Sequence, residues 1–233
     1  MTAREGGLAS ATWTELPDAP TVLVPVGSIE QHGPHLPLDT DTAIATAVAT
    51  AAAGELAAGG RQVLVAPALS YGSSGEHQHF AGTSSIGTNV LHDVAVELTR
   101  SMRTWAGRVV FVNAHGGNLA ALRGAVRQLV DEGHDVDWVA CATEEVDLHA
   151  GRTETSLMLH LRPGDVRLDR AEAGNTGSLE ELLPLMMSGG IRAVSANGVL
   201  GDPAGASAEE GAAVLAAMVS DVVAAVGGAV PVR

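Results

Sequence analysis

Residues 21–41 read TVLVPVGSIEQHGPHLPLDTD, and this stretch decides the fold of the chain. The apolar run 21–27 predicts a buried strand that ends at a glycine. Open α/β sheets place their chemistry at the carboxyl ends of the strands and in the loops that follow them. Four groups that can bind a cation lie there in this chain: Glu30, His32, His35 and Asp41.

Asp41 opens an alanine-rich helical pattern, where the helix dipole favours a carboxylate. Mixed oxygen and nitrogen ligands are typical of zinc, manganese or iron sites rather than of calcium sites. The motif therefore indicates a transition-metal site. The alternative interpretation is a polar loop whose imidazoles are simply hydrated.

Strand-like runs alternate with helical patterns along the chain. We expect strands at 21–27, 62–67, 108–113 and 137–142, with helices between them at 41–58, 88–105 and 117–132. This alternation predicts right-handed βαβ units, an α/β fold and a mostly parallel central sheet covered on both faces. Further helices are expected at 153–161, 178–188 and 207–226. No linker divides the chain, so we expect a single domain over residues 1–233.

The composition argues against several function classes. The net charge of −14, without any basic cluster, argues against nucleic acid or an anionic membrane as a partner. All thirteen basic residues are arginine, so there is no lysine for a Schiff base or a P-loop. The only cysteine, Cys141, lies in an apolar stretch and is interpreted as a buried small hydrophobe rather than a nucleophile.

The sequence also indicates where the protein works. Residues 1–7 contain no apolar segment, so no signal peptide is expected. The run 43–58 contains Glu55 and too many alanines to span a bilayer. A single cysteine allows no disulfide within the chain, which fits a reducing compartment. We therefore expect a soluble, cytoplasmic protein.

Two more polar segments follow predicted strands. The loop 71–80 carries Glu76, His77 and His79, which can be ligands, substrate contacts or hydrated side chains. His115 directly follows the strand 108–113 beside paired glycines and is well placed to reach the same crevice as Glu30 and His32. The rival interpretation of this turn, a glycine-rich phosphate-binding loop, lacks the required spacing of glycines and acidic residues.

The last polar segment leads into the expected helix 153–161. Glu154 lies at the start of that helix, where a capping carboxylate would need no further role, and His149 sits in a flexible turn five residues earlier. The remaining histidines receive structural interpretations. His160 is expected in the core, His92 on a helix surface and His134 in a turn.

Together the strand ends offer enough carboxylates and imidazoles for a metal pair bridged by one carboxylate, with an imidazole left for proton transfer. At this point the chain resembles the creatininase family of dinuclear metal amidohydrolases. The segments that carry the resemblance run in order through nearly the whole chain: 25–41, 75–83, 113–118, 149–156 and 198–211.

The resemblance implies a three-layer α/β/α sandwich, symmetric homo-oligomers and two divalent ions per chain (zinc, iron or manganese). Amide hydrolysis would use a hydroxide activated by the metal pair. By the same resemblance, Glu30 and His115 are ligands of one metal, His32 of the other, and Asp41 bridges them. His149 is the implied proton shuttle.

The chain departs from the creatininase pattern at two positions. Creatininase has a ligand glutamate where this chain has Gly117. The missing carboxylate disfavours creatinine as the substrate. It also makes Glu154 the expected replacement, both as a metal ligand and as a carboxylate of the catalytic site. Ala81 stands where the family often has proline.

Within the family, the segments 36–42, 150–156 and 193–203 are most similar to a peptidase branch. That branch releases the modified carboxyl-terminal Val-Tyr unit of a ribosomally made precursor peptide of a redox cofactor. Two alternatives remain open. One is hydrolysis of a small cyclic amide or formamide, and the other is a non-catalytic protein that binds a ligand in the sheet crevice.

Overall fold

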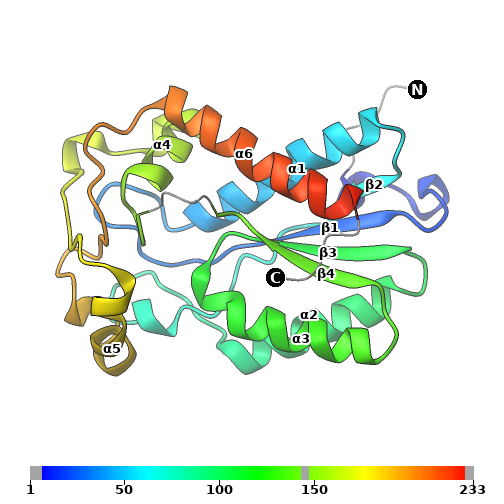
Figure 1. The fold of residues 1–233 in the computed structure, drawn as a ribbon, viewed down its shortest axis with the longest axis horizontal. Helices are drawn as coiled ribbons and strands as arrows, with labels where there is room; N and C mark the ends of the chain where they lie inside the picture. The colour runs from blue at the N-terminus through cyan, green and yellow to red at the C-terminus, as the bar shows by residue number, and fades with distance from the viewer. Residues whose placement is uncertain (1–6, 143–146, 229–233) are drawn as a thin grey trace.

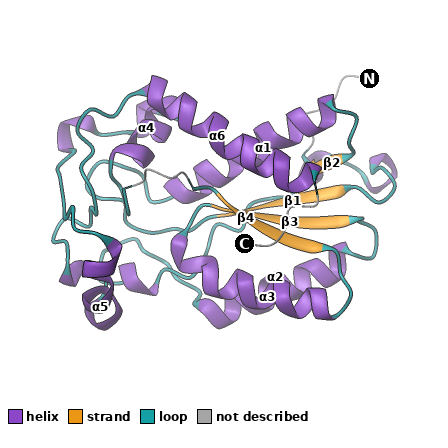
Figure 2. Ribbon diagram, viewed as in Figure 1, coloured by secondary structure: helices purple, strands orange, loops and turns teal. Residues whose placement is uncertain are grey.

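The computed structural model describes residues 7–142 and 147–228 (Figure 1). The amino-terminal segment, for which no signal peptide is expected, lies almost entirely outside these ranges. In the described part of the chain the strands form one sheet, and its helices cover both faces (Figure 2).

The sheet is parallel throughout, in the strand order β2-β1-β3-β4. Its strands are β1 (Thr21–Val26), β2 (Val63–Val65), β3 (Arg108–Asn113) and β4 (Val136–Ala140). Each predicted strand is present, with ends that shift by no more than two residues. The central strands β1 and β3 are buried on both faces, which explains why they read as continuous apolar runs rather than as alternating patterns.

Two helical layers enclose the sheet. One layer contains α1 (Thr40–Ala58), α4 (Arg152–Leu161) and α6 (Ala208–Gly227), and the other contains α2 (Thr88–Met102) and α3 (Leu119–Asp131). Leu23 on β1 packs toward the first layer, whereas its neighbours Val22 and Val24 pack toward the second, as the alternation of strand side chains requires. The expected α/β/α sandwich is confirmed.

Helix α5 (Leu179–Gly189) lies apart from these layers, beyond the carboxyl ends of the strands (Figure 1). Short 3-10 turns complete the described chain at Leu8–Ser10, Trp13–Glu15, Gly75–His77, Gly116–Asn118, Pro163–Asp165, Leu168–Arg170 and Ile191–Ala193.

Helix α6 is, among the described helices, the one that is long and apolar enough to cross a membrane, with a hydropathy of 1.6. It packs instead along α1 and α4, with Val219 and Val222 buried and Asp221 exposed. The run 43–58, which the sequence indicates is too rich in alanine to span a membrane, forms most of α1. The two helices pack against each other in the same layer.

Two structural expectations need correction. His160 is exposed on α4, because the buried side of that helix is made by Leu157 and Met158 and not by the histidine. Cys141 is half-buried rather than fully buried, at the end of β4. Burial, followed by the charge of Asp41, raises the pKa of its thiol to about 12, so it carries no thiolate at neutral pH.

Candidate metal centre

The carboxyl ends of β1 and β3 bring together polar side chains that are far apart in the sequence. Glu30 and His32 follow β1, His115 follows β3, Asp41 lies in the first turn of α1, and Glu154 lies in the first turn of α4. Two groups of potential ligands result, Glu30–Asp41–His115 and His32–Asp41–Glu154, and within each the ligand atoms lie within 4.8 Å of one another. Asp41 belongs to both groups.

Asp41 turns its two carboxylate oxygens toward different imidazoles. Its Oδ1 lies 3.0 Å from His32 Nε2, and its Oδ2 lies 3.4 Å from His115 Nδ1. Burial, reinforced by the charge of Glu30 and opposed by the two imidazoles, raises the pKa of Asp41 to about 6. A carboxylate oriented in this way can be shared by two cations.

Glu30 is fully buried beside three imidazoles. Its Oε2 lies 3.2 Å from His115 Nε2, and its Oε1 lies 3.4 Å from His77 Nε2. Burial opposes ionisation of this carboxyl, but the charge and hydrogen bonding of His115, followed by the charge of His32, outweigh burial and hold its pKa well below the ordinary value.

His32 and His115 supply the matching positive charge. His32 donates from Nδ1 to the backbone oxygen of Glu30 at 3.2 Å, and this contact directs Nε2 toward Asp41 and toward Glu154 Oε2 at 3.9 Å. Burial disfavours a charged imidazole, yet the surrounding carboxylates outweigh burial and raise the pKa of both histidines to about 10. In the absence of a cation, protons on these imidazoles therefore balance the buried carboxylates.

The donor set fits divalent ions. Both carboxylate oxygens of Glu30 and Oδ2 of Asp41 are buried without a hydrogen-bond partner. Burying a carboxylate without partners is costly unless a cation or a donor compensates. Carboxylate and imidazole ligands together suit zinc, iron and manganese. The side chains that the sequence predicts as ligands thus lie together at the carboxyl ends of the strands.

His149 lies at the edge of this cluster, 3.8 Å from Glu30 through its Nδ1. Its Nε2 donates to the backbone oxygen of Gln31 at 2.7 Å, and because that oxygen can only accept, the lone pair of the ring is on Nδ1. Burial, followed by the positive charge of His32, lowers the pKa of His149 to about 4. The ring is thus neutral at pH 7 and can accept a proton. His149 also forms a third potential ligand group with Glu30 and His32.

Gln31 is a site residue that the sequence analysis missed. Its Nε2 lies 2.9 Å from His77 Nδ1, 3.1 Å from His149 Nε2 and 3.0 Å from the backbone oxygen of Gly198. The side chain of Gln31 therefore holds His77, whereas its backbone oxygen holds His149, whose Nε2 donates there and cannot accept from the Gln31 amide. In the sequence, only the position of Gln31 between Glu30 and His32 indicated that it could belong to the site.

Gly117 leaves room for a neighbouring loop. A Cβ atom at this position would meet the backbone oxygen of Ser73, the carboxylate of Glu76 and the ring of His115. Glu76 Oε1 instead lies 3.6 Å from His115 Nε2, and burial raises the pKa of Glu76. A carboxyl group beside the paired glycines also disfavours the phosphate-binding interpretation of the turn.

Not every sequence candidate joins the cluster. His35 is buried but bonds through Nε2 to Thr155 Oγ1 at 2.9 Å, outside all three ligand groups. Of the three candidates in the loop 71–80, His77 and Glu76 reach the cluster, whereas His79 is exposed. His92 and His134 are half-buried, on α2 and in the turn after α3, close to the expected places.

The contacts of Glu154 fit both interpretations of this residue, a metal ligand and a carboxylate that caps helix α4. Its Oε2 accepts a hydrogen bond from Ala150 N at 2.6 Å, at the start of α4, and the same oxygen faces His32. Asp147 contributes separately to this helix start, since its Oδ2 accepts from Thr153 N at 3.2 Å.

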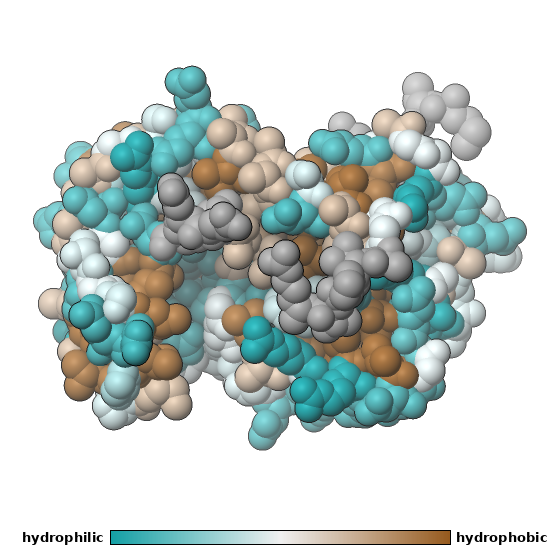
Figure 3. All heavy atoms as spheres, viewed as in Figure 1, coloured by the Kyte–Doolittle hydropathy of each residue, from teal (hydrophilic) through white to brown (hydrophobic). Residues whose placement is uncertain are grey.

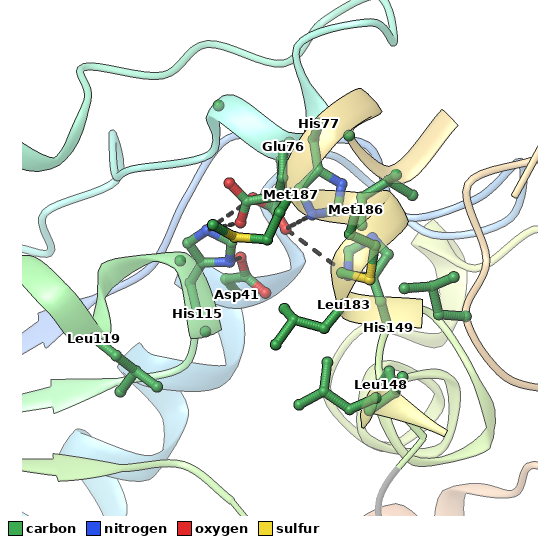
Figure 4. Close-up of a pocket in the computed structure, with 18 of the residues that line it drawn as sticks. Asp41, Glu76, His77, His115, Leu119, Leu148, His149, Leu183, Met186 and Met187 are labelled. Carbon is green, nitrogen blue, oxygen red and sulfur yellow. Dashed lines mark ion pairs between the residues drawn. The ribbon is translucent and has the colours of Figure 1, made fainter. Parts of the chain in front are cut away.

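These groups line a cavity of about 780 Å³ (Figure 4). The loop Gly75–His77 forms one wall and α5 another. Glu30, Asp41, His115, His149 and Glu154 all line the same cavity, so one bound molecule could contact these five groups, whereas His32 lies behind them and does not line it.

Comparison with known proteins adds a family context. The family model described as "Creatinine amidohydrolase" matches residues 9–226. The chain is 54% identical over 223 residues to the "Mycofactocin precursor peptide peptidase" of Mycobacterium ulcerans, covering 94% of this chain and 89% of that protein. It is 53% identical over 216 residues to the protein of the same name from Mycolicibacterium smegmatis, covering 92% and 87%.

Solved structures of creatininases share the fold of this chain. A creatinine amidohydrolase (creatininase) superposes with a TM-score of 0.78 at 26% identity and covers 99% of this chain and 100% of that chain. A mutant creatininase described as "Zn-Zn type" gives a TM-score of 0.77 at 25% identity, covering 96% and 98%. "Creatininase Mn" gives 0.76 at 27% identity with the same coverage. Metal is thus present in neighbours of this fold.

Metal binding should release protons. Because the pKa of His32 and of His115 is about 10, both imidazoles are protonated at pH 7 in the metal-free protein and must lose a proton to act as ligands. We expect release of about two protons per chain and tighter binding as the pH rises from 6 to 8. Calorimetric titration with Zn²⁺ in buffers of different ionisation enthalpy measures both quantities.

His92→Ala serves as the control and should leave the proton count unchanged, whereas His115→Ala should lower it by about one. Affinity that does not vary with pH would contradict the assignment of these two imidazoles as protonated ligands.

Proposed function

This chain belongs to the creatininase family of metal-dependent amide hydrolases, and we propose that it is a peptidase acting on the mycofactocin precursor peptide. The bond cut would be the amide before the modified carboxyl-terminal Val-Tyr unit. The identity of 54% over 94% of the chain supports the substrate. The observation that carries the chemistry is the pair of ligand groups sharing Asp41 on the wall of the 780 Å³ cavity.

The proposed cofactor is a pair of divalent ions, zinc, iron or manganese. Glu30, His115 and Asp41 would hold one ion, and His32, Asp41 and Glu154 the other. The unpartnered buried oxygens of Glu30 and Asp41 support two sites that share a carboxylate. When bound, such ions acidify a water molecule and polarise the carbonyl of the scissile amide.

His149 would transfer the proton that the reaction requires. Peptide hydrolysis takes a proton from water and must deliver one to the departing amine nitrogen. His149 is neutral at pH 7, its Nδ1 lone pair points toward Glu30, and its Nε2 is held by the backbone of Gln31. An imidazole fixed in this way can accept the proton at Nδ1 and donate it from the same atom.

The cavity supports a peptide rather than a small cyclic amide. A volume of about 780 Å³ falls in the range that accommodates drug-sized molecules, many times that of a small ring. Gly117 also lacks the carboxylate that creatininase carries there, and the contacts around it leave no room for a larger side chain. Both features separate this site from a small-amide pocket.

We further propose that the enzyme is a cytoplasmic homo-oligomer that binds neither nucleic acid nor membranes. The net charge of −14 supports the absence of polyanionic partners. Trp13, Val90 and Val130 are exposed apolar side chains outside the cavity, suited to contacts between copies. Light scattering of the purified protein measures the number of subunits.

The substrate proposal is tested with the modified precursor peptide. Incubation with the metal-loaded enzyme should release the terminal unit, and mass spectrometry of the products locates the cut. A small cyclic amide and a formamide are offered in parallel. If the peptide stays intact while either small amide is turned over rapidly, the enzyme is a small-amide hydrolase and not a peptidase.

Glu154→Gln should reduce the metal content from about two ions per chain toward one, because the amide is a poorer ligand than the carboxylate. Elemental analysis after dialysis measures the stoichiometry. Asp147→Asn is the matched control, since Asp147 supports the same helix start but belongs to neither ligand group. If Glu154→Gln keeps about two metal ions per chain and its melting temperature falls only as much as that of the control, then Glu154 caps the helix and is not a ligand.

His149→Ala should keep both ions and lose about 10²–10⁴-fold in kcat, the usual contribution of a positioned acid or base. Added imidazole should restore part of the rate. The exposed His160→Ala provides a control on α4 that should behave as the wild type. If His149→Ala loses an ion instead, then His149 is a ligand in the third group, with Glu30 and His32.

A further inference from the structure

Helix α5 forms a wall of the cavity and is anchored at both of its ends. A capping box at its start, in which Ser178 and Glu181 exchange hydrogen bonds, stabilises the first turn. Leu182 is buried against Ile191 and Leu200, which anchors one side of the helix. Its end is held at Gly190, which has a φ of +70° and lies so close to the backbone oxygen of Glu76 that a Cβ atom would clash.

A second side of α5 faces the cavity with apolar side chains. Leu179, Leu183, Met186 and Met187 recur at helical spacing, and all four line the cavity. Figure 4 shows Leu183, Met186 and Met187 at this wall. Leu183 is 45% exposed and Met187 is 81% exposed. Figure 3 shows apolar side chains gathered over α5 beside a hollow in the surface. Apolar side chains left exposed at the mouth of a reactive site indicate a binding surface.

The charges of the cavity limit what this surface can bind. No arginine is found among the described residues that line it, and the chain has no lysine. Glu76 and Asp147 add carboxyl groups beyond the ligand groups. The occupant next to α5 is therefore apolar and carries no anionic group at this position.

We propose that Leu179, Leu183 and Met187 form the subsite that binds the apolar side chains of the peptide substrate next to the scissile amide. The inference rests on the proposed peptidase function and adds the residues that select the substrate. The same cavity reaches Glu30, Asp41 and His149, so a chain lying along α5 brings its amide to the reactive groups. Valine and tyrosine-derived groups match such a surface, because both have apolar bodies. The flexible thioether of Met187 can adapt to a modified side chain.

Leu185 supplies a matched control on the same helix. It is 54% exposed, comparable to Leu183, but it does not line the cavity. Substituting either leucine by asparagine removes the same side chain from an equally exposed position on α5. A difference between the two variants therefore reports contact with the substrate and not the stability of the helix.

The experiment measures kcat and KM for the modified precursor with the metal-loaded wild type, Leu183→Asn, Met187→Ser and Leu185→Asn. We expect KM to rise about tenfold or more in Leu183→Asn and Met187→Ser with kcat nearly unchanged, because uniform binding of an apolar group is lost. Leu185→Asn should match the wild type. Metal content and elution volume on size exclusion should be equal in all four proteins.

Three outcomes would overturn the inference. Equal effects of Leu183→Asn and Leu185→Asn would place the cause in the folding of α5. A change of elution volume in Leu183→Asn alone would make this side of α5 an interface between copies. Unchanged KM in both cavity variants would mean that the peptide does not touch α5. Failure of the wild type to cleave the peptide is a separate result, because it rejects the proposed function before any variant is compared.

Discussion

The shared position of Asp41 between two imidazoles is the constraint on which the rest of the structure depends. Its carboxylate is buried with that of Glu30, and three of the four oxygens lack a hydrogen-bond partner. Two such charges side by side in a protein interior are tolerated only if positive charge lies among them. The protonated imidazoles of His32 and His115 meet this need without metal, and divalent ions would meet it when bound. The arrangement of the site is therefore set by the need to balance the buried carboxylates with positive charge.

The parallel sheet provides this arrangement by ending β1 and β3 side by side. Asn118 ties the two ends together, since its Nδ2 donates to the backbone oxygen of Gly27 and to Asn113 Oδ1, while its Oδ1 accepts from Ser73 N. Gly117 lets the loop at Ser73 and Glu76 pack directly against His115. Rigid neighbours of this kind hold ligand side chains in place, which matters because a shift of about 1 Å in a catalytic group can cost about 10²-fold in rate.

Under the proposed function, reaction and selection would be divided between two parts of the fold. The ends of the sheet strands and the first turns of α1 and α4 supply the ionisable groups. Helix α5, outside the layers, supplies an apolar wall over the same cavity. Such a division would allow related proteins to act on different amides. The charged groups at the sheet can stay the same while the wall changes to suit another substrate.

The sequence by itself determined the strands, the helices and the identity of the ionisable groups at the strand ends, because apolar periodicity and short motifs are local properties. Glu30, His32 and Asp41 could be placed together since all three lie within the 12 consecutive residues 30–41. Only the tertiary structure decided which side chains from distant segments meet. It buried His77 beside Glu30, turned His35 toward Thr155, exposed His160 and set Leu183 over the cavity. The physical reason is that these contacts join segments tens of residues apart, and their geometry depends on how helices and loops pack on the sheet, which no local pattern encodes.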